Sequence, residues 1–165
     1  MRIPLPLLLF VLAVNTVGCY SLNGISITEE TDTYYVEQFE VNALEAPAEL
    51  GQQFSEQLKQ RINSDTRLAF DDVNADVVFE GAVVAFSVEP ESANADNRAD
   101  LSRLTVRVSV DYVDTVTEAN SYTQTFTEFE VFDATANLFD IQDDLLAQIF
   151  ERIVEDSFNK AFSNW

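Results

Sequence analysis

Polar and hydrophobic residues alternate along four segments of the chain, most regularly at residues 101–113. There Leu104, Val106 and Val108 are separated by single polar residues, which predicts a strand with one buried face and one face in water. Segments rich in Val, Phe, Tyr or Thr predict three further strands, and Gly81 within one of them marks either a bulge or a close backbone approach. These strands are expected at residues 33–41, 76–88 and 121–132.

Two other segments repeat an apolar residue at about every fourth position, as amphipathic helices do. After Pro47, the series Leu50, Phe54, Leu58 and Ile62 predicts a helix of about four turns. A second helix is expected to begin near Asp140, whose carboxylate can cap free backbone N–H groups. We expect Trp165 to pack beside the apolar stripe of this helix. The stripe comprises Ile141, Leu145, Ile149, Ile153, Phe158 and Phe162.

The order of these elements predicts the fold class. A strand, a helix, three strands and a helix follow one another, and the polar, acidic residues 90–100 form a hairpin loop. Because both helices have one apolar face, they are expected to cover one side of a sheet. We therefore predict an α+β fold, a two-layer sandwich with two amphipathic helices on one face of a mainly antiparallel four-stranded sheet. Residues 33–165 are long enough to form this as a single domain.

The residues before the domain have the layout of a secretory signal peptide. Arg2 precedes the apolar stretch from Ile3 to Val14, and small residues lead to Cys19, so the segment is too short to span a membrane. Cys19 is the only cysteine, so it cannot form an intramolecular disulfide, and attachment to a diacylglyceride would use its thiol. Thr16 departs from the Leu that usually precedes such a cysteine by three positions, and the alternative is an ordinary secretion signal with a free thiol. We expect a signal peptide at residues 1–18 and a lipidated N-terminus and tether at residues 19–32.

The amino-acid composition argues against some classes of protein and of partner. The chain has 29 Asp and Glu against 9 Lys and Arg, a formal net charge of −20, which argues against nucleic-acid binding. Its 47% hydrophobic content and 13 Phe exclude a disordered chain. Such an acidic coat is expected where salt screens self-repulsion, as in a salty habitat. A moderately acidic periplasmic protein is the alternative.

The residues needed for most enzyme chemistry are missing. The chain has no histidine, so the commonest general base and metal ligand is missing. Because Cys19 is assigned to lipid, the residues of a Cys-His or Ser-His-Asp nucleophilic site are missing as well. Paired acids occur at residues 71–72 and 143–144, but adjacent acids are expected by chance in so acidic a chain. No segment has the alternating acids and the turn glycine of a calcium-binding loop, and Asp96 and Asp100 match that pattern only weakly. We expect no catalytic residue, no metal and no cofactor.

Arginines are the remaining candidates for ligand or partner contacts. Arg103 and Arg107 lie on the same, water-facing side of one predicted strand, and Arg98 comes just before it. Guanidinium groups arranged in this way suit bidentate capture of phosphate or carboxylate. The alternative is that they pair with the protein's own acids, such as Asp111 or a glutamate on the next strand.

Several segments of the sequence resemble the LptE-type lipopolysaccharide-assembly lipoproteins. The likeness rests on the lipoprotein signal with its Cys-Tyr-Ser-Leu start, on residues 61–68, 78–81 and 104–108, and above all on the ending Phe158-Asn159-Lys160-Ala161-Phe162-Ser163-Asn164-Trp165. It covers nearly the whole mature chain and is closest to a divergent branch of the family with this aromatic ending.

The resemblance implies a function and a location. Members are non-enzymatic outer-membrane lipoproteins with helices packed on a four-stranded sheet. They plug the lumen of the LptD β-barrel, help it to fold and assist delivery of lipopolysaccharide to the cell surface. The partners implied here are an LptD-type barrel, lipopolysaccharide and, through the lipid anchor, the membrane. The alternative is a periplasm-facing binding lipoprotein of the same fold that docks a different envelope partner.

Overall fold

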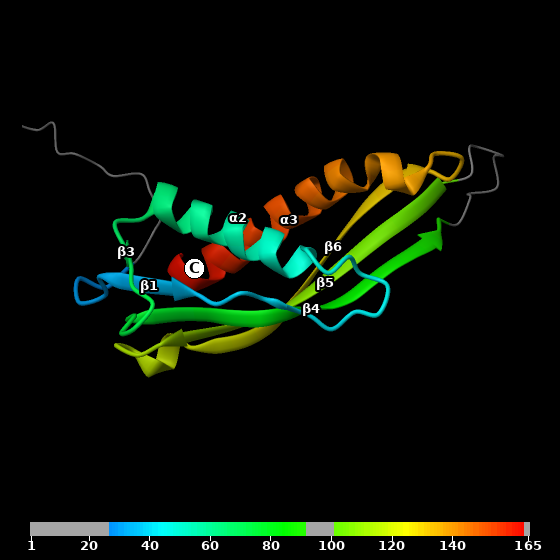
Figure 1. Ribbon diagram of the computed structural model, residues 1–165. Helices are drawn as coiled ribbons and strands as arrows, with labels where there is room; N and C mark the ends of the chain where they lie inside the picture. The colour runs from blue at the N-terminus through cyan, green and yellow to red at the C-terminus, as the bar shows by residue number, and fades with distance from the viewer. Residues whose placement is uncertain (1–26, 92–100, 164–165) are drawn as a thin grey trace, which may run out of the picture.

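The computed structural model describes residues 27–91 and 101–163, and Figure 1 shows how their elements are arranged. The expectations for residues 1–26, for Arg98 and for Trp165 lie outside these residues. Along the chain the elements are β1 (Thr33–Val36), β2 (Glu40–Val41), α2 (Leu50–Asp65), β3 (Ala69–Phe70), β4 (Val77–Pro90), β5 (Leu101–Asp114), the 3-10 helix η2 (Glu118–Asn120), β6 (Tyr122–Asp133) and α3 (Leu138–Phe162).

One sheet runs through the described part of the chain, with the strand order β3-β1-β4-β5-β6 and with β2 also paired to β4. The long strands β4, β5 and β6 are antiparallel neighbours, whereas β1 and β2 run parallel to β4. Both helices lie on the same side of this sheet (Figure 1). The predicted α+β class is therefore confirmed, but the expected count of four strands is wrong, because the sheet has six.

One extra strand arises because the chain leaves the sheet between β1 and β2. The side chain of Phe39 turns into the core there, where its ring centroid lies 4.8 Å from that of Phe54, and its backbone N–H donates to Ser55 Oγ at 2.9 Å. Gly81 makes room for this ring, since a Cβ at that position would collide with the Phe39 ring and with the carbonyl of Ser109. Its φ of 153° also favours glycine. Gly81 thus marks a close approach of two elements, and the register shift of β4 lies further on, between Val83 and Ala85.

Both predicted helical stripes face the core. Every apolar residue of the first stripe is buried, and so is the second stripe from Leu145 to Phe162. The second helix begins slightly earlier than expected, because the side chain of Asn137 rather than Asp140 accepts from the backbone N–H of Phe139. No helix among the described residues is long and apolar enough to cross a membrane.

A network of aromatic rings joins the two layers. Phe54 of α2 meets Phe150 of α3 with ring centroids 5.5 Å apart. On the sheet, Phe79 packs against Tyr112 at 4.9 Å and reaches Phe162 of α3 at 5.9 Å. Aromatic side chains bury large apolar areas, so this network stabilises the attachment of both helices to one side of the sheet.

Candidate partner-binding surface

Neither of the two described α-helices covers the other side of the sheet (Figure 1), and we call that side the open face. Because side chains alternate along a strand, the core takes Val106, Val108 and Val110 of β5 while the residues between them point the other way. The pairing register then shows which residues of β4 and β6 lie on the same face as these residues of β5. The open face comprises Val78, Glu80, Ala82, Ala85, Ser87 and Glu89 of β4, Leu101, Arg103, Thr105, Arg107, Ser109, Asp111 and Val113 of β5, and Thr123, Thr125, Thr127, Phe129, Val131 and Asp133 of β6.

Most side chains in the middle of the open face are short. β6 contributes three exposed threonines at alternate positions, and the facing parts of β5 and β4 contribute Ser, Thr and Ala. Toward one end, Phe129 and Val131 are 43% and 37% exposed. A face of short polar side chains lets another protein approach the sheet closely, and the apolar pair adds area that a partner can bury.

Arg103 lies at the apolar end of the open face and is already engaged. Its Nε donates to Glu91 Oε2 at 2.7 Å and its Nη2 donates to Glu91 Oε1 at 2.8 Å. The guanidinium also lies over the ring of Phe129, 4.1 Å from the centroid. The pair is partly exposed, so it contributes only modestly to stability, but it fixes the guanidinium against the sheet.

Arg107 has a different environment on the same strand. Its cross-strand neighbours are Ala85 on β4 and Thr127 on β6, and Thr105 and Ser109 flank it on β5. No ion pair of Arg107 occurs within the described ranges 27–91 and 101–163, and its side chain is exposed. Arg107 therefore presents a positive charge above a floor of small side chains, in a position where an acidic group of a partner could reach it.

The other two sequence-predicted residues are not placed. Cys19 and Arg98 both lie outside the described residues. The structure thus brings Arg103 and Arg107 onto one face, as the strand alternation predicted, and leaves the lipidation site and the third arginine as predictions.

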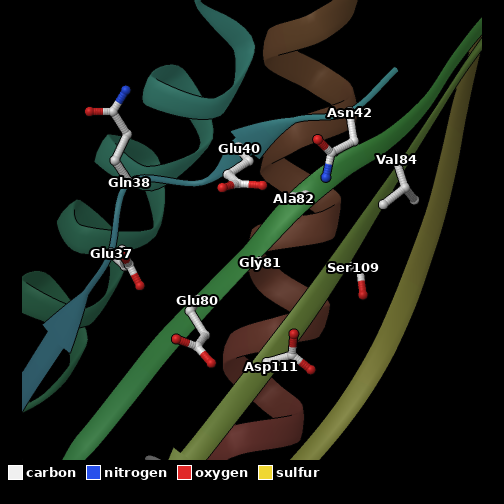
Figure 2. Close-up of a pocket in the computed structure, with 10 residues that line it drawn as sticks. All are labelled: Glu37, Gln38, Glu40, Asn42, Glu80, Gly81, Ala82, Val84, Ser109 and Asp111. Atoms are coloured by element: carbon white, nitrogen blue, oxygen red, sulfur yellow. The ribbon is translucent and has the colours of Figure 1, made fainter. Parts of the chain in front are cut away.

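A hollow of about 430 Å³ opens on the same face where β2 meets β4 (Figure 2). Its floor consists of Gly81, Ala82 and Ser109, whose side chains are absent or short. Four carboxylates line it, from Glu37, Glu40, Glu80 and Asp111. No group of three or more Cys, Asp or Glu side chains converges to hold a metal ion anywhere in the described part of the chain. The hollow therefore adds negative potential to the open face rather than a recognisable metal site.

Sequence reasoning did not predict the charged contacts of Arg152 at the edge of the sheet. Arg152 of α3 reaches over β6, where its Nε donates to Glu128 at 2.9 Å, its Nη1 to Glu130 at 2.6 Å and its Nη2 to the carbonyl of Phe129 at 2.8 Å. Two glutamates at alternate positions of a strand are a sequence signal for acids on one face. The arginine that they bind comes from a helix more than twenty residues later, so the pairing depends on how α3 packs.

Known proteins that are similar to this chain indicate its family and its fold. The family model described as LptE, lipopolysaccharide-assembly, matches residues 31–161. None of the curated proteins matches the sequence. Among solved structures, uncharacterized lipoprotein B from Nitrosomonas europaea is similar with a TM-score of 0.50 and 12% identity, over 78% of this chain and 80% of that one. A minor lipoprotein from Acinetobacter baumannii has a TM-score of 0.49 and 12% identity, over 81% of this chain and 97% of that one.

Proposed function

Because this chain belongs to the LptE family of lipopolysaccharide-assembly proteins, we propose that it is a non-enzymatic outer-membrane lipoprotein that plugs and helps to assemble an LptD-type β-barrel. The observation that carries the proposal is the extent of the family match. Residues 31–161 include every described strand, all of α2 and nearly all of α3. The whole folded domain, and not a single motif, therefore corresponds to the family.

We propose that the N-terminal segment anchors this domain. Residues 1–18 act as the signal peptide, Cys19 receives the diacylglyceride, and residues 19–32 tether the domain to the membrane. Each buried methylene adds about 0.8 kcal/mol of membrane affinity, so two or three acyl chains hold a protein where one would not. The anchor keeps the domain in the periplasm beside the barrel that it is to enter.

The open face is the surface that we propose to lie against the barrel. The interior walls of such barrels are polar, and the short Thr, Ser and Ala side chains of the open face suit a polar, closely fitting contact. Arg107 supplies a cation for an acidic group of the lumen or for a lipopolysaccharide phosphate. Arg103 takes part in the same contact only if it gives up or shares its pairing with Glu91.

A rival function is supported by the charge of the chain. A protein with 29 acids and 9 basic residues meets an acidic glycolipid at an electrostatic disadvantage. The rival is a lipoprotein of the same fold that binds a different, basic envelope partner.

Gentle detergent extraction of native membranes, followed by capture through a C-terminal tag, distinguishes the two functions. We expect an outer-membrane β-barrel of the LptD type to be recovered in a ratio near one to one. Alanine substitution of Arg107 should weaken this recovery, and the loss should be larger at low salt because a partly exposed charge is screened as salt rises. Recovery of another envelope protein without a barrel would overturn the proposal and support the rival.

A further inference from the structure

The edge of the sheet formed by β6 is a second surface that the fold leaves available. β6 extends over twelve residues, Tyr122–Asp133, and pairs with β5 in continuous register on one side only. The opposite edge of the sheet ends in the two-residue strand β3. Proteins usually protect a long edge strand with proline, lysine, a bulge or a covering segment, because its free backbone groups can pair with another chain. From Thr123 to Thr127 the sequence of β6 contains no proline and no lysine, and its pairing contains no bulge.

One backbone hydrogen bond and the strand register fix which backbone groups of β6 face outward. In an antiparallel sheet, residues of a strand bond alternately to one neighbour and to the other. The carbonyl of Leu101 accepts from Glu91 N–H at 2.8 Å, so the odd-numbered residues of β5 bond toward β4 and its even-numbered residues bond toward β6. Since Tyr112 of β5 lies opposite Tyr122, the even-numbered residues of β6 are the paired ones. The N–H and C=O groups of the odd-numbered residues, including Thr123, Thr125 and Thr127, therefore point away from the sheet.

A contact of Arg152 confirms that the odd-numbered residues of β6 point outward, and it limits the length of the edge that a partner could use. Its Nη2 donates to the carbonyl of Phe129, the next odd-numbered residue, from outside the sheet. This contact covers the edge at Phe129. Among the described residues, the outward backbone groups of Thr123, Thr125 and Thr127 make no such contact. The available edge is therefore the stretch Thr123–Thr127.

Charges beside this stretch indicate what kind of segment it would accept. α3 lies along β6, as the bond from Tyr122 Oη to the carbonyl of Ser157 and the ion pairs of Arg152 show. Asp156 lies on this part of α3, and burial together with the charges of Glu128 and Glu155 raises the pKa of its carboxyl. Two cations lie here, Arg152, which pairs with Glu128 and Glu130, and Lys160, whose Nζ lies 4.9 Å from the ring centroid of Tyr122. The acids Glu128, Glu130, Glu155 and Asp156 outnumber them. A lysine or arginine entering beside Asp156 would relieve this repulsion, whereas a second copy of so acidic a chain would increase it.

We propose that the β6 edge between Thr123 and Thr127 accepts an extended segment of a partner protein, which adds a seventh strand and places a lysine or arginine beside Asp156. Main-chain hydrogen bonds to the outward groups of the three threonines hold the segment, and the basic side chain selects it. The proposal goes beyond the barrel-plug function, because it concerns the edge of the sheet and stands whichever envelope protein supplies the segment.

The test uses the protein extracted from native membranes in detergent micelles and a synthetic nonapeptide in which Thr alternates with Lys. Two matched peptides serve as controls, one with Glu in place of Lys and one methylated at its backbone nitrogens. We expect the basic peptide to slow amide hydrogen exchange at Thr123, Thr125 and Thr127 by about tenfold or more. Backbone methylation should weaken binding by about tenfold or more, since it removes main-chain hydrogen bonds but keeps the charge. The acidic peptide should not bind.

Two variants test whether the carboxylate of Asp156 contributes to binding of the basic peptide. Asp156→Asn should weaken binding of the basic peptide several-fold, whereas Asp143→Asn, which removes one exposed acid elsewhere on α3, should leave it unchanged. Equal binding of the methylated and unmethylated peptides, protection of amides elsewhere, or no binding of the basic peptide would each overturn the proposal. Protection of the same amides by self-association would overturn the choice of partner. None of these results depends on recovery of a barrel, so this proposal and the barrel-plug function fail separately.

Discussion

Replacing Phe158 with Ala tests whether α3 is held by its aromatic face. The side chain is 1% exposed, its ring lies 5.1 Å from that of Phe162, and the guanidinium of Arg61 lies 5.1 Å from its centroid. Truncation of such a residue costs about 3 to 5 kcal/mol, because both the transfer energy and the contacts around the new cavity are lost. Domains of this size are stable by only about 5 to 15 kcal/mol, so the variant should lose a large share of its stability.

The expected shift in melting temperature follows from the size of the folded part. At roughly 3 to 5 °C per kcal/mol, the loss corresponds to a fall of about 10 to 25 °C. Circular dichroism during heating and during urea titration measures it. The matched control is Phe139→Ala on the same helix, where the side chain is 87% exposed and the change should stay within about 0.5 kcal/mol. Similar shifts for the two variants would refute the assignment of the buried face.

Three further outcomes are expected. Gly51→Ala should destabilise the domain by about 1 to 3 kcal/mol in urea titration, because the added Cβ would overlap the carbonyl of Phe39; unchanged stability would show that this approach is looser than the structure indicates. Asp76 Oδ2 accepts from Asp32 N–H, Thr33 N–H and Thr33 Oγ1, and these bonds hold the pKa of Asp76 below its usual value. The ionised carboxylate of Asp76 therefore stabilises the fold fully above its unfolded pKa of about 3.9, and this stabilisation is lost as the pH falls through the lower pKa of the folded state. Between about pH 5 and pH 2.5, the melting temperature of Asp76→Asn should therefore fall less than that of wild type. Cys19→Ala should appear in the soluble periplasmic fraction or as uncleaved precursor, and normal membrane retention of this variant would contradict the anchor.

The helices and long strands could be predicted from sequence because each has a buried face with its own period. Leu50, Phe54, Leu58 and Ile62 repeat every fourth residue, and all four are fully buried. The alternation of β5 likewise placed Arg103 and Arg107 on the same face. Local periodicity was sufficient in these segments because the core contacts each element along its whole length.

The six-stranded sheet could not be counted from sequence. β3 is only Ala69–Phe70, and both residues are exposed, so it has no alternation to detect. The break between β1 and β2 depends on Phe39, Ser55 and Gly81, which come together only in the folded protein. Short parallel strands are fixed by such tertiary contacts rather than by their own composition.

The pairing of the arginines with particular acids could not be predicted from the sequence either. The ion pair between Arg103 and Glu91 joins the start of β5 to the end of β4, and Arg152 joins α3 to β6. With 29 acids in the chain, sequence alone offers many partners for each arginine. Only the strand register and the packing of α3 select among them.

Site-specific photo-cross-linking in intact cells can show whether the open face lies against a barrel. A photoreactive phenylalanine analogue at position 107 reports what lies against the open face, and the same analogue in place of Tyr112 is the control, because Tyr112 is 3% exposed on the opposite face of the same strand. We expect an adduct between position 107 and an LptD-type barrel, and none from position 112. An adduct from position 107 with another protein alone, or none although the barrel is recovered by capture through the tag, would contradict the placement of the open face against the barrel.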